Sequence, residues 1–548
     1  MPALLIYNDN THLKFVDNHH RDYNISANNY QVRTHQNGTS YSVYNIGLAL
    51  LWLPFFLIAH LVASLSNYAS DGLSAPYQWT IILCSLCYIT LGFYYLRKLL
   101  LEFFTDKVVA LTLISIAFAT NWFYYATQDI ALTHLYLFSL QAIFLYYIYQ
   151  YNKNGTAKYL ILSGLLLGIM TLIRSSEILL IIIPVFWGFN PKELLKHPIK
   201  LLFNLTKRGI QYTFLALPIF FLQILYYKIS NDVWFIDGYN DHKFDWLDTH
   251  IYDCLFSYRR GWFIYTPIMC FITLGFYYLL KNMKQLFWAI LIFTFVYCYV
   301  VFSWEIWWYG NTFGCRPVVQ NYATLALPLA TFYYAILKNN TRRNLMILFT
   351  ISCFIFLNLF QTWQYNKRIL PLDFINKSYY WKVFLKKHKD NHDKILLDFT
   401  DSRPDLTNKN LTLYKNKFPL YIRATSNNIY SEYTKVLNHP VNYNNVRAFT
   451  NKWLQIRLSL TYKGSAYTKW KHPSLIVHVS RNQTKNNKNK TLLYKQLRIP
   501  HVINDKSDSL NFGLNLPHLK EGDLIKFYFQ NKTRDSIEIN NLEIDIWE

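Results

Sequence analysis

The sequence predicts a polytopic α-helical membrane protein followed by a separate all-β domain, and three observations support this fold class. Of its 548 residues, 52% are hydrophobic and only 16% are charged, so the apolar surface exceeds what one soluble core can bury. The first two thirds of the chain contain repeated apolar runs separated by short polar connections. In the last third the hydrophobic period changes to two, which indicates β-strands.

The apolar runs predict about 10–11 hydrophobic helices, because most of them approach the roughly 20 residues that cross a bilayer. They are Val43–Ser66, Tyr77–Leu96, Val108–Tyr125, Leu132–Tyr151, Tyr159–Ile173, Ile178–Phe189, Ile210–Ile229, Trp262–Leu280, Leu286–Phe302, Val318–Leu337 and Leu345–Phe360. Tyr159–Ile173 and Ile178–Phe189 are short and need flanking residues to span. We place the transmembrane domain at residues 43–363, after an N-terminal polar stretch at residues 1–42.

Lysine and arginine occupy every second connection between these runs, which predicts that those connections are cytoplasmic. The cationic residues are Arg97, Lys98, Lys153, Lys158, Lys192, Lys196, Lys200, Lys207, Arg208, Lys281, Lys284, Lys338, Arg342 and Arg343. The alternate connections, among them Arg174–Glu177, Asn231–Gly261 and Ser303–Pro317, then face outward, as does the chain after Phe360. We attribute the net charge of +23 to this orientation and to contact with anionic membrane lipid, and we expect no nucleic-acid partner.

Metal and cofactor sites have little support in the sequence. All seven cysteines, from Cys84 to Cys353, lie in or beside the apolar part of the chain. Cys84 and Cys87 have C-x-x-C spacing, but without a second pair the spacing favours packing over zinc or redox chemistry. No acidic cluster has the character of a metal site. We therefore expect no cofactor and no metal, and a divalent ion stays an unsupported alternative.

A stretch from Ser303 to Pro328 is polar and aromatic at first and continues from Val318 into the next apolar run. It contains Trp304, Trp307, Trp308 and Tyr309, whose amphipathic rings suit a membrane–water boundary. Glu305 and Arg316 are charges at or near this boundary, where ionised groups are costly. Two readings stay open, a ligand site and an interfacial aromatic belt with snorkelling charges. Arg259 and Arg260 lie on a connection assigned outward, against the cation pattern, and are candidates for ligand binding or for contacts with lipid headgroups.

The tail divides into a charged connector, residues 364–404, and a β-sandwich domain, residues 405–548. Leu454, Ile456, Leu458 and Leu460 alternate with polar residues, and Ile537, Ile539, Leu542, Ile544 and Ile546 form a similar set. The domain is either a rigid spacer or a module that binds carbohydrate or a partner. Tyr467 and Trp470 are candidates for stacking on a sugar or for strand core positions.

Four segments of the chain resemble marker segments of bacterial GT-C glycosyltransferases, which are related to protein O-mannosyltransferases and aminoarabinose lipid A transferases. The segments are Tyr41–Gly47, Leu172–Ser175, Phe256–Pro267 and Trp307–Pro317. The resemblance implies a GT-C-like fold in the inner membrane of a bacterium, with the C-terminal domain extracytoplasmic. It also implies an enzyme that transfers a sugar from a polyprenyl-phosphate carrier to a glycan, lipid or protein acceptor on the outer face.

This chemistry suggests roles for the outward residues, since arginine binds phosphate oxygens bidentately and stays protonated. We assign Arg259, Arg260 and Arg316 to the lipid phosphate, with Arg174 in support. His134 is a donor to phosphate or sugar, or else a structural histidine. Trp308 and Tyr309 form a wall on which a sugar stacks.

The N-terminus departs from the family pattern, in which the catalytic aspartate follows a first transmembrane helix. The resemblance implies that this sequence begins after that helix, that the base lies upstream of Met1, and that Val43–Ser66 is re-entrant or interfacial. Asp9, Asp17 and Asp22 are the substitutes within the sequence. An alternative topology places residues 1–42 in the cytoplasm. Three function classes follow: a lipid-linked sugar transferase, a lipid-linked glycan transporter, and an inactive relative that binds glycan or a partner.

Overall fold

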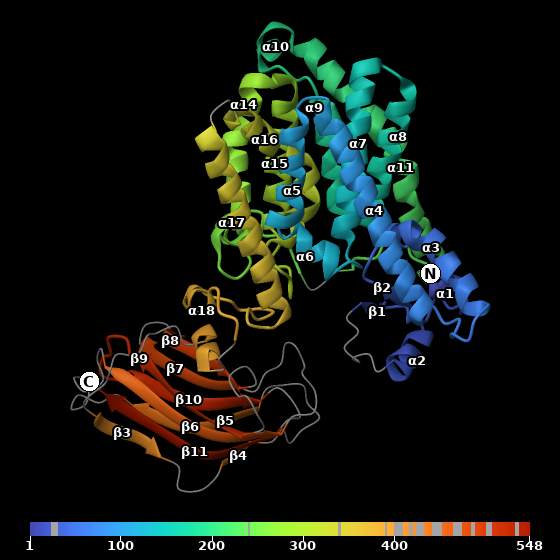
Figure 1. Cartoon of the computed structure of the whole chain (residues 1–548). Helices are drawn as coiled ribbons and strands as arrows, with labels where there is room; N and C mark the ends of the chain where they lie inside the picture. The colour runs from blue at the N-terminus through green and yellow to red at the C-terminus, as the bar shows by residue number, and fades with distance from the viewer. Residues whose placement is uncertain are drawn as a thin grey trace. The chain divides into compact units, whose positions relative to one another are not determined.

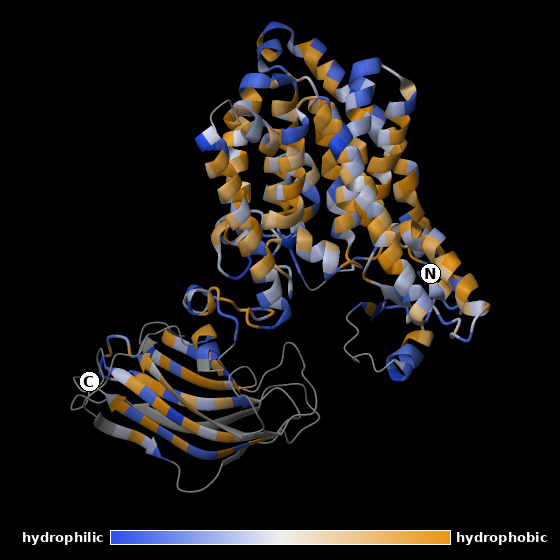
Figure 2. Ribbon diagram, viewed as in Figure 1, coloured by the Kyte–Doolittle hydropathy of each residue, from blue (hydrophilic) through white to orange (hydrophobic). Residues whose placement is uncertain are grey.

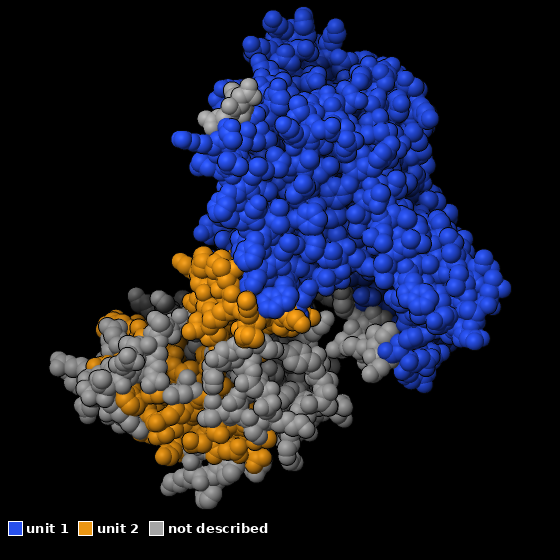
Figure 3. All heavy atoms as spheres, viewed as in Figure 1, with its two compact units in different colours: residues 1–366 blue, residues 367–548 orange. Residues whose placement is uncertain are grey.

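The computed structural model describes residues 1–23, 31–238, 242–337, 341–388, 392–398, 409–415, 420–422, 432–440, 452–463, 474–483, 488–499, 507–531 and 536–547. The chain forms two compact units, Met1–Asn366 and Lys367–Glu548 (Figure 3). The first unit is almost entirely helical, and the second consists mainly of β-strands (Figure 1).

The elements of the first unit begin with two short helices and a β-hairpin. In order they are α1 (Pro2–Leu5), α2 (Phe15–Asp22), β1 (Val32–Thr34), β2 (Ser40–Ser42), α3 (Gly47–Ser64), α4 (Ala75–Leu101), α5 (Asp106–Ala119), α6 (Trp122–Thr127), α7 (Thr133–Asn154), α8 (Ala157–Ile173), η1 (Ser175–Ile181), α9 (Ile182–Phe186), α10 (Pro191–Lys196), α11 (Pro198–Asn231), α12 (Ile251–Phe256), α13 (Trp262–Tyr265), η2 (Pro267–Cys270), α14 (Phe271–Asn282), α15 (Lys284–Phe302), η3 (Arg316–Asn321), α16 (Tyr322–Ile336) and α17 (Thr341–Asn366).

Several of these helices suit a membrane. Among the described residues, α3, α4, α11, α15 and α17 are long and apolar enough to cross one, and shorter apolar helices cover Ala157–Ile173 and Ser175–Phe186. Hydrophobic residues cover the helices for most of their length (Figure 2). Large apolar side chains such as Phe214 and Phe295 are exposed, as expected for surfaces that face lipid. The protein is therefore a multi-pass membrane protein, and the expected fold class of helical membrane part and β domain is confirmed.

Some expected spans are broken rather than continuous. Trp262–Leu280 divides into α13, η2 and α14, because Thr266 (φ −140°, ψ 60°) precedes Pro267 and the proline ring disfavours helical dihedrals there. Val108–Tyr125 divides into α5 and α6 at Thr120, whose backbone is extended. Ile178–Phe189 divides into η1 and α9, and Val318–Leu337 into η3 and α16. Apolar composition predicted these segments, but it did not predict the breaks.

The core of the first unit is built around α16. Every residue from Tyr322 to Tyr333 is buried, so this helix has protein on all sides, and it packs on α14, α5 and α7. Its contact with α14 is a backbone contact: a Cβ on Gly275 would lie 2.1 Å from the carbonyl oxygen of Pro328. α7 is buried along much of its length as well. The N-terminal turns of α16 and α7, from Tyr322 and His134 on, are therefore enclosed by protein.

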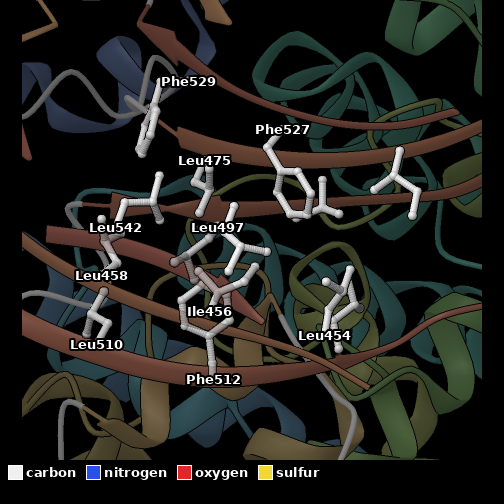
Figure 4. Close-up of a cluster of buried hydrophobic side chains, with 14 of the residues drawn as sticks. Leu454, Ile456, Leu458, Leu475, Leu497, Leu510, Phe512, Phe527, Phe529 and Leu542 are labelled. Atoms are coloured by element: carbon white, nitrogen blue, oxygen red, sulfur yellow. The ribbon is translucent and has the colours of Figure 1, made fainter. Parts of the chain in front are cut away.

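The second unit is an antiparallel β-sandwich preceded by α18 (Lys377–Val383) and η4 (His392–Leu397). Its strands are β3 (Lys409–Lys415), β4 (Leu420–Ile422), β5 (Glu432–Pro440), β6 (Trp453–Lys463), β7 (Ser474–Gln483), β8 (Lys488–Arg498), β9 (Ser507–Asn515), β10 (Leu524–Asn531) and β11 (Ser536–Trp547). One sheet has the order β5-β10-β7-β8, and the other has β3-β11-β6-β9 with β4 also paired to β11. Buried side chains of both sheets meet in one core (Figure 4).

The alternating sets in the tail lie where the hydrophobic pattern placed them. The leucines and isoleucines of β6 and β11 are buried in this core. In β11 the step from Ile539 to Leu542 is three residues instead of two, and the register with β6 shifts there, so Asn540 is an extra residue. This β-bulge keeps Leu542 on the same face as Ile539. Tyr467 and Trp470 lie outside the described residues.

Candidate functional site

Two loops that are far apart in sequence form the framework of the site. The loop that follows α15, residues 303–315, is called the aromatic loop below. It pairs with residues 243–250 of the loop before α12. The amide of Asp245 donates to the carbonyl of Ser303 over 2.6 Å, and Phe244 and Trp304 form an isolated antiparallel bridge. Backbone pairing of this kind fixes the aromatic loop beside the segment that carries Arg259.

Tyr309 lies where the aromatic loop reverses. Its backbone has φ 53°, and Gly310 follows with φ 73°. Left-handed backbone at a non-glycine residue is uncommon and needs support from its surroundings. Here the Tyr309 hydroxyl donates to the carbonyl of Val301 over 2.6 Å. The ring lies 5.9 Å from the guanidinium carbon of Arg174 and 5.9 Å from that of Arg316. The turn therefore brings one aromatic ring to two of the predicted phosphate-binding arginines.

Arg259 stacks on the next aromatic residue of the same loop. Its guanidinium carbon lies 3.7 Å from the centre of the Trp308 ring and 5.8 Å from that of Trp307. Such cation–π contacts hold a planar guanidinium group in place against the ring. Arg174, Arg259 and Arg316, which come from three separate segments, thus share a wall made by Trp308 and Tyr309. We call these five residues the arginine–aromatic cluster.

Arg260 has a different environment from Arg259. It is 2% exposed, donates from Nη1 to the carbonyl of Arg259 over 2.9 Å, and lies 5.8 Å from the Tyr365 ring. Arg260 is therefore buried beside α17, and we assign it a supporting position. The sequence had grouped the two adjacent arginines together.

A buried hydrogen-bond network lies next to the cluster. Gln320 of η3 is its centre, bonded to His134 over 2.8 Å and to Glu177 over 3.0 Å. Tyr297 donates to the same Glu177 oxygen over 3.1 Å. Glu177, Gln320 and His134 are all nearly inaccessible to solvent. The amide of Glu177 donates to the carbonyl of Arg174 over 2.9 Å, and Arg316 and Gln320 both belong to η3, so the network and the cluster are neighbours.

Glu177 is a residue that sequence reasoning missed. The apolar pattern makes Glu177 only the end of a short connection, because Ile178 begins an apolar run directly after it. An acidic residue beside an apolar run costs free energy unless it has hydrogen-bonding or ionic partners. The position of Glu177 was therefore the signal that the sequence offered.

The far end of the aromatic loop is anchored by α6 and its N-terminal residue. Asn121 donates to the carbonyl of Phe313 over 3.1 Å and accepts from the Tyr322 hydroxyl over 2.6 Å. Tyr125 also donates to the carbonyl of Phe313, over 3.1 Å. The break between α5 and α6 is thus the point at which Asn121 holds the loop.

The three candidate aspartates lie in the N-terminal segment. Asp9 accepts hydrogen bonds from the amides of His12 and Lys14. Burial opposes its ionisation, but these amides lower the pKa of Asp9 overall. Asp17 and Asp22 are exposed on α2. Within the described residues, no hydrogen bond or ion pair joins any of the three to the arginine–aromatic cluster.

Asp71, between α3 and α4, is a second residue that the sequence did not single out. It accepts from the Tyr23 hydroxyl and, over 2.9 Å each, from the amides of Leu73 and Ser74. Burial raises and these hydrogen bonds lower the pKa of Asp71, and the net effect is a lowered value. The bond to Asp71 raises the pKa of Tyr23 to about 12. This pair ties α2 to the loop before α4.

The last observations concern possible metal ligands and the comparison of this chain with known proteins. Among the described residues, no group of three or more His, Cys, Asp or Glu is arranged to hold a metal ion. No protein-family model matches the chain, and no curated protein matches it either. Among solved structures, the arabinosyltransferase EmbB from Mycobacterium smegmatis is similar over 88% of this chain, with 10% identity and a TM-score of 0.29. The match covers 59% of the EmbB chain.

Proposed function

We propose that this protein is a membrane glycosyltransferase that moves a sugar from a polyprenyl-phosphate donor to a glycan, lipid or protein acceptor. In this proposal the arginine–aromatic cluster binds the donor, and the reaction takes place on the outer face of a bacterial inner membrane. The C-terminal sandwich is then extracytoplasmic. The ordered segments that resemble GT-C transferases support the proposal from the sequence.

The observation that carries the proposal is the convergence of three arginines on one aromatic wall. Arg174, Arg259 and Arg316 supply planar donors that match phosphate oxygens, and they remain charged at any physiological pH. Trp308 and Tyr309 are suited to stacking on the apolar face of a sugar. As the sugar leaves its carrier, negative charge accumulates on the phosphate, and donors already in place stabilise it.

The orientation rests on the distribution of charge. The connections that carry the cluster alternate with the cationic ones. At the opposite end of α7 from His134, Lys153 pairs with Glu102 over 2.8 Å, so the two kinds of connection lie at different ends of this helix.

The test is a transfer assay with the purified full-length protein in detergent. We would use radiolabelled polyprenyl-phosphate-linked hexoses and pentoses as donors and an envelope extract as acceptor. Arg316→Ala is expected to lower transfer about 10²-fold, the usual cost of one preorganised donor. Arg97→Ala is the matched control, because Arg97 lies in an exposed pair with Asp106.

Three outcomes would overturn the proposal. Wild-type protein that binds these lipids but transfers no sugar would be a binding scaffold. Movement of labelled lipid that occurs only in sealed vesicles would identify a transporter. Equal transfer by Arg316→Ala and wild type would remove the cluster from the reaction.

A further inference from the structure

We propose that α10 and the first turns of α11 form a binding site for anionic phospholipids of the membrane. α10 lies at one end of the helical unit (Figure 1). The site combines lysines with exposed apolar side chains. It shares no residue with the arginine–aromatic cluster and does not depend on the proposed reaction.

The length of α11 places its first turns outside the hydrocarbon core of a bilayer. The helix has 34 residues and is about 51 Å long, whereas the core is about 30 Å thick. Near its far end the ammonium of Lys228 lies 5.4 Å from the centre of the exposed Trp234 ring, a pairing that suits the membrane–water boundary. The roughly 20 residues that cross the core lead back from Lys228 to Lys207 and Arg208. Residues 198–206 then lie at the level of the lipid headgroups.

Apolar side chains continue into this segment on the surface of α11. Ile199, Leu202 and Phe203 are 84%, 66% and 67% exposed, and their spacing places them on one helix face. The same face continues along the helix with the exposed side chains of Ile210, Phe214, Leu217 and Phe221. Leu195 of α10 is 89% exposed as well. Lipid removes such side chains from water when the segment lies against the membrane.

The chain turns at His197, between α10 and α11. The backbone of His197 has φ −142° and ψ 61°, because the ring of Pro198 disfavours helical dihedrals at the preceding residue. This turn brings the lysines of both helices together. Lys192, Lys196 and Lys200 line one hollow of about 350 Å³, and the other residues that line it are Asn190, Glu193, His197 and Leu201.

A second hollow with mainly apolar walls adjoins the first. Pro198, Ile199 and Phe203 line it, and it shares His197 and Lys200 with the basic hollow. An anionic phospholipid has the matching form, because its phosphate fits the lysines while an acyl chain follows the apolar side chains. Lysines that only set the orientation of the chain would need no apolar side chains among them.

The charge of the segment is complementary to an anionic lipid. Residues 190–208 contain five Lys and Arg residues and a single carboxylate, that of Glu193. Within the described residues, no ion pair joins a carboxylate to Lys192, Lys196 or Lys200. A cluster of this size beside a membrane-spanning helix attracts anionic headgroups.

The experiment measures lipid binding by the purified full-length protein in detergent, with native mass spectrometry as the readout. The probes are dioleoyl-phosphatidylglycerol, phosphatidylcholine with the same acyl chains, and glycerol 3-phosphate. The basic variant combines Lys192→Gln, Lys196→Gln and Lys200→Gln. The apolar variant combines Ile199→Ser and Phe203→Ser and keeps every charge.

A matched control loses the same charge elsewhere. It replaces three exposed lysines of other connections that the cation pattern groups with this one, by Lys107→Gln, Lys158→Gln and Lys284→Gln. Thermal unfolding of each variant is measured in parallel. All the substituted side chains are exposed, so each variant should unfold within a few degrees of wild type.

We expect wild type to bind phosphatidylglycerol at least about tenfold more tightly than phosphatidylcholine. The basic variant should lose about 10²-fold in affinity for phosphatidylglycerol, since each lysine near a membrane surface contributes about fivefold. The apolar variant should lose about tenfold. The control variant should stay within about threefold of wild type, because its lysines lie outside the two hollows.

Three results would overturn the proposal. An equal loss of affinity in the basic and control variants would show a diffuse positive field in place of a site. Equal affinity of wild type for the two lipids would show that the lysines do not select an anionic headgroup, and this result needs no variant to fold. Binding of glycerol 3-phosphate as tight as that of phosphatidylglycerol would identify a site for a free anion that makes no use of the apolar face.

Discussion

Replacing Trp308 with leucine is expected to weaken donor binding rather than catalysis. The guanidinium carbon of Arg259 lies 3.7 Å from the centre of the Trp308 ring, so the indole directly supports this side chain. A cation–π contact is worth about 0.5–2 kcal/mol depending on exposure. Because about 1.4 kcal/mol corresponds to a tenfold change, loss of this contact should raise the KM for the lipid donor roughly 2- to 30-fold. The Trp307 ring, at 5.8 Å, should retain part of the effect.

The assay is steady-state transfer in detergent over a range of donor concentrations, with thermal unfolding measured in parallel. Trp79→Leu is the matched control, because Trp79 is a 55% exposed tryptophan on α4 and has no part in the cluster. A KM within twofold of wild type in folded Trp308→Leu would refute the claim that this stack positions Arg259 for the donor. A fall in kcat alone would show that Trp308 acts on the transition state instead.

Two further predictions concern stability and pH. Arg481→Met should destabilise the sandwich by about 3–5 kcal/mol, because it leaves the buried carboxylate of Asp523 without the two bonds of 2.8 and 2.7 Å. Lys415→Met should cost under about 1 kcal/mol, because Lys415 is exposed and lies 3.9 Å from its partner Glu543. Burial raises the pKa of Asp523 and these bonds lower it, with a lowered pKa as the net effect. The ion pair therefore contributes its full stability above the usual pKa of 3.8 and loses it as pH falls through the lowered pKa. Equal free energies of unfolding for the two variants would contradict this prediction. The hydrogen bond between Tyr23 and Asp71 should keep α2 in place at neutral pH. It weakens in acid, as pH falls through the lowered pKa of Asp71. It also weakens in alkali, as pH rises from 10.0 through the pKa of about 12 of Tyr23. Limited proteolysis of residues 15–22 should accelerate at both limits in wild type and at neutral pH in Tyr23→Phe, and an unchanged rate in that variant would argue against the contact.

Local hydrophobic patterns in the sequence predicted most of the architecture. Side chains on one face of a strand recur at every second residue. The alternation of apolar and polar residues in β6 and β11 therefore predicted the sandwich core without knowledge of the strand partners. The long apolar runs predicted helices for a membrane in the same way. Breaks were harder to foresee. Thr120 and Asn121 lie in an apolar run, and only the contact of Asn121 with the aromatic loop gives a reason for the break there.

Residue type and loop position by themselves determined the membrane fold, the all-β tail and the candidate set that includes Arg174, Arg259 and Arg316. Only the tertiary structure decided which of these side chains meet. It separated Arg259 from its neighbour Arg260, and it joined Glu177 to His134 through Gln320. The physical reason is that hydropathy reports how much surface a segment buries, whereas a site depends on directional contacts between groups over a hundred residues apart. Those contacts exist only once α7, η1 and η3 have packed together.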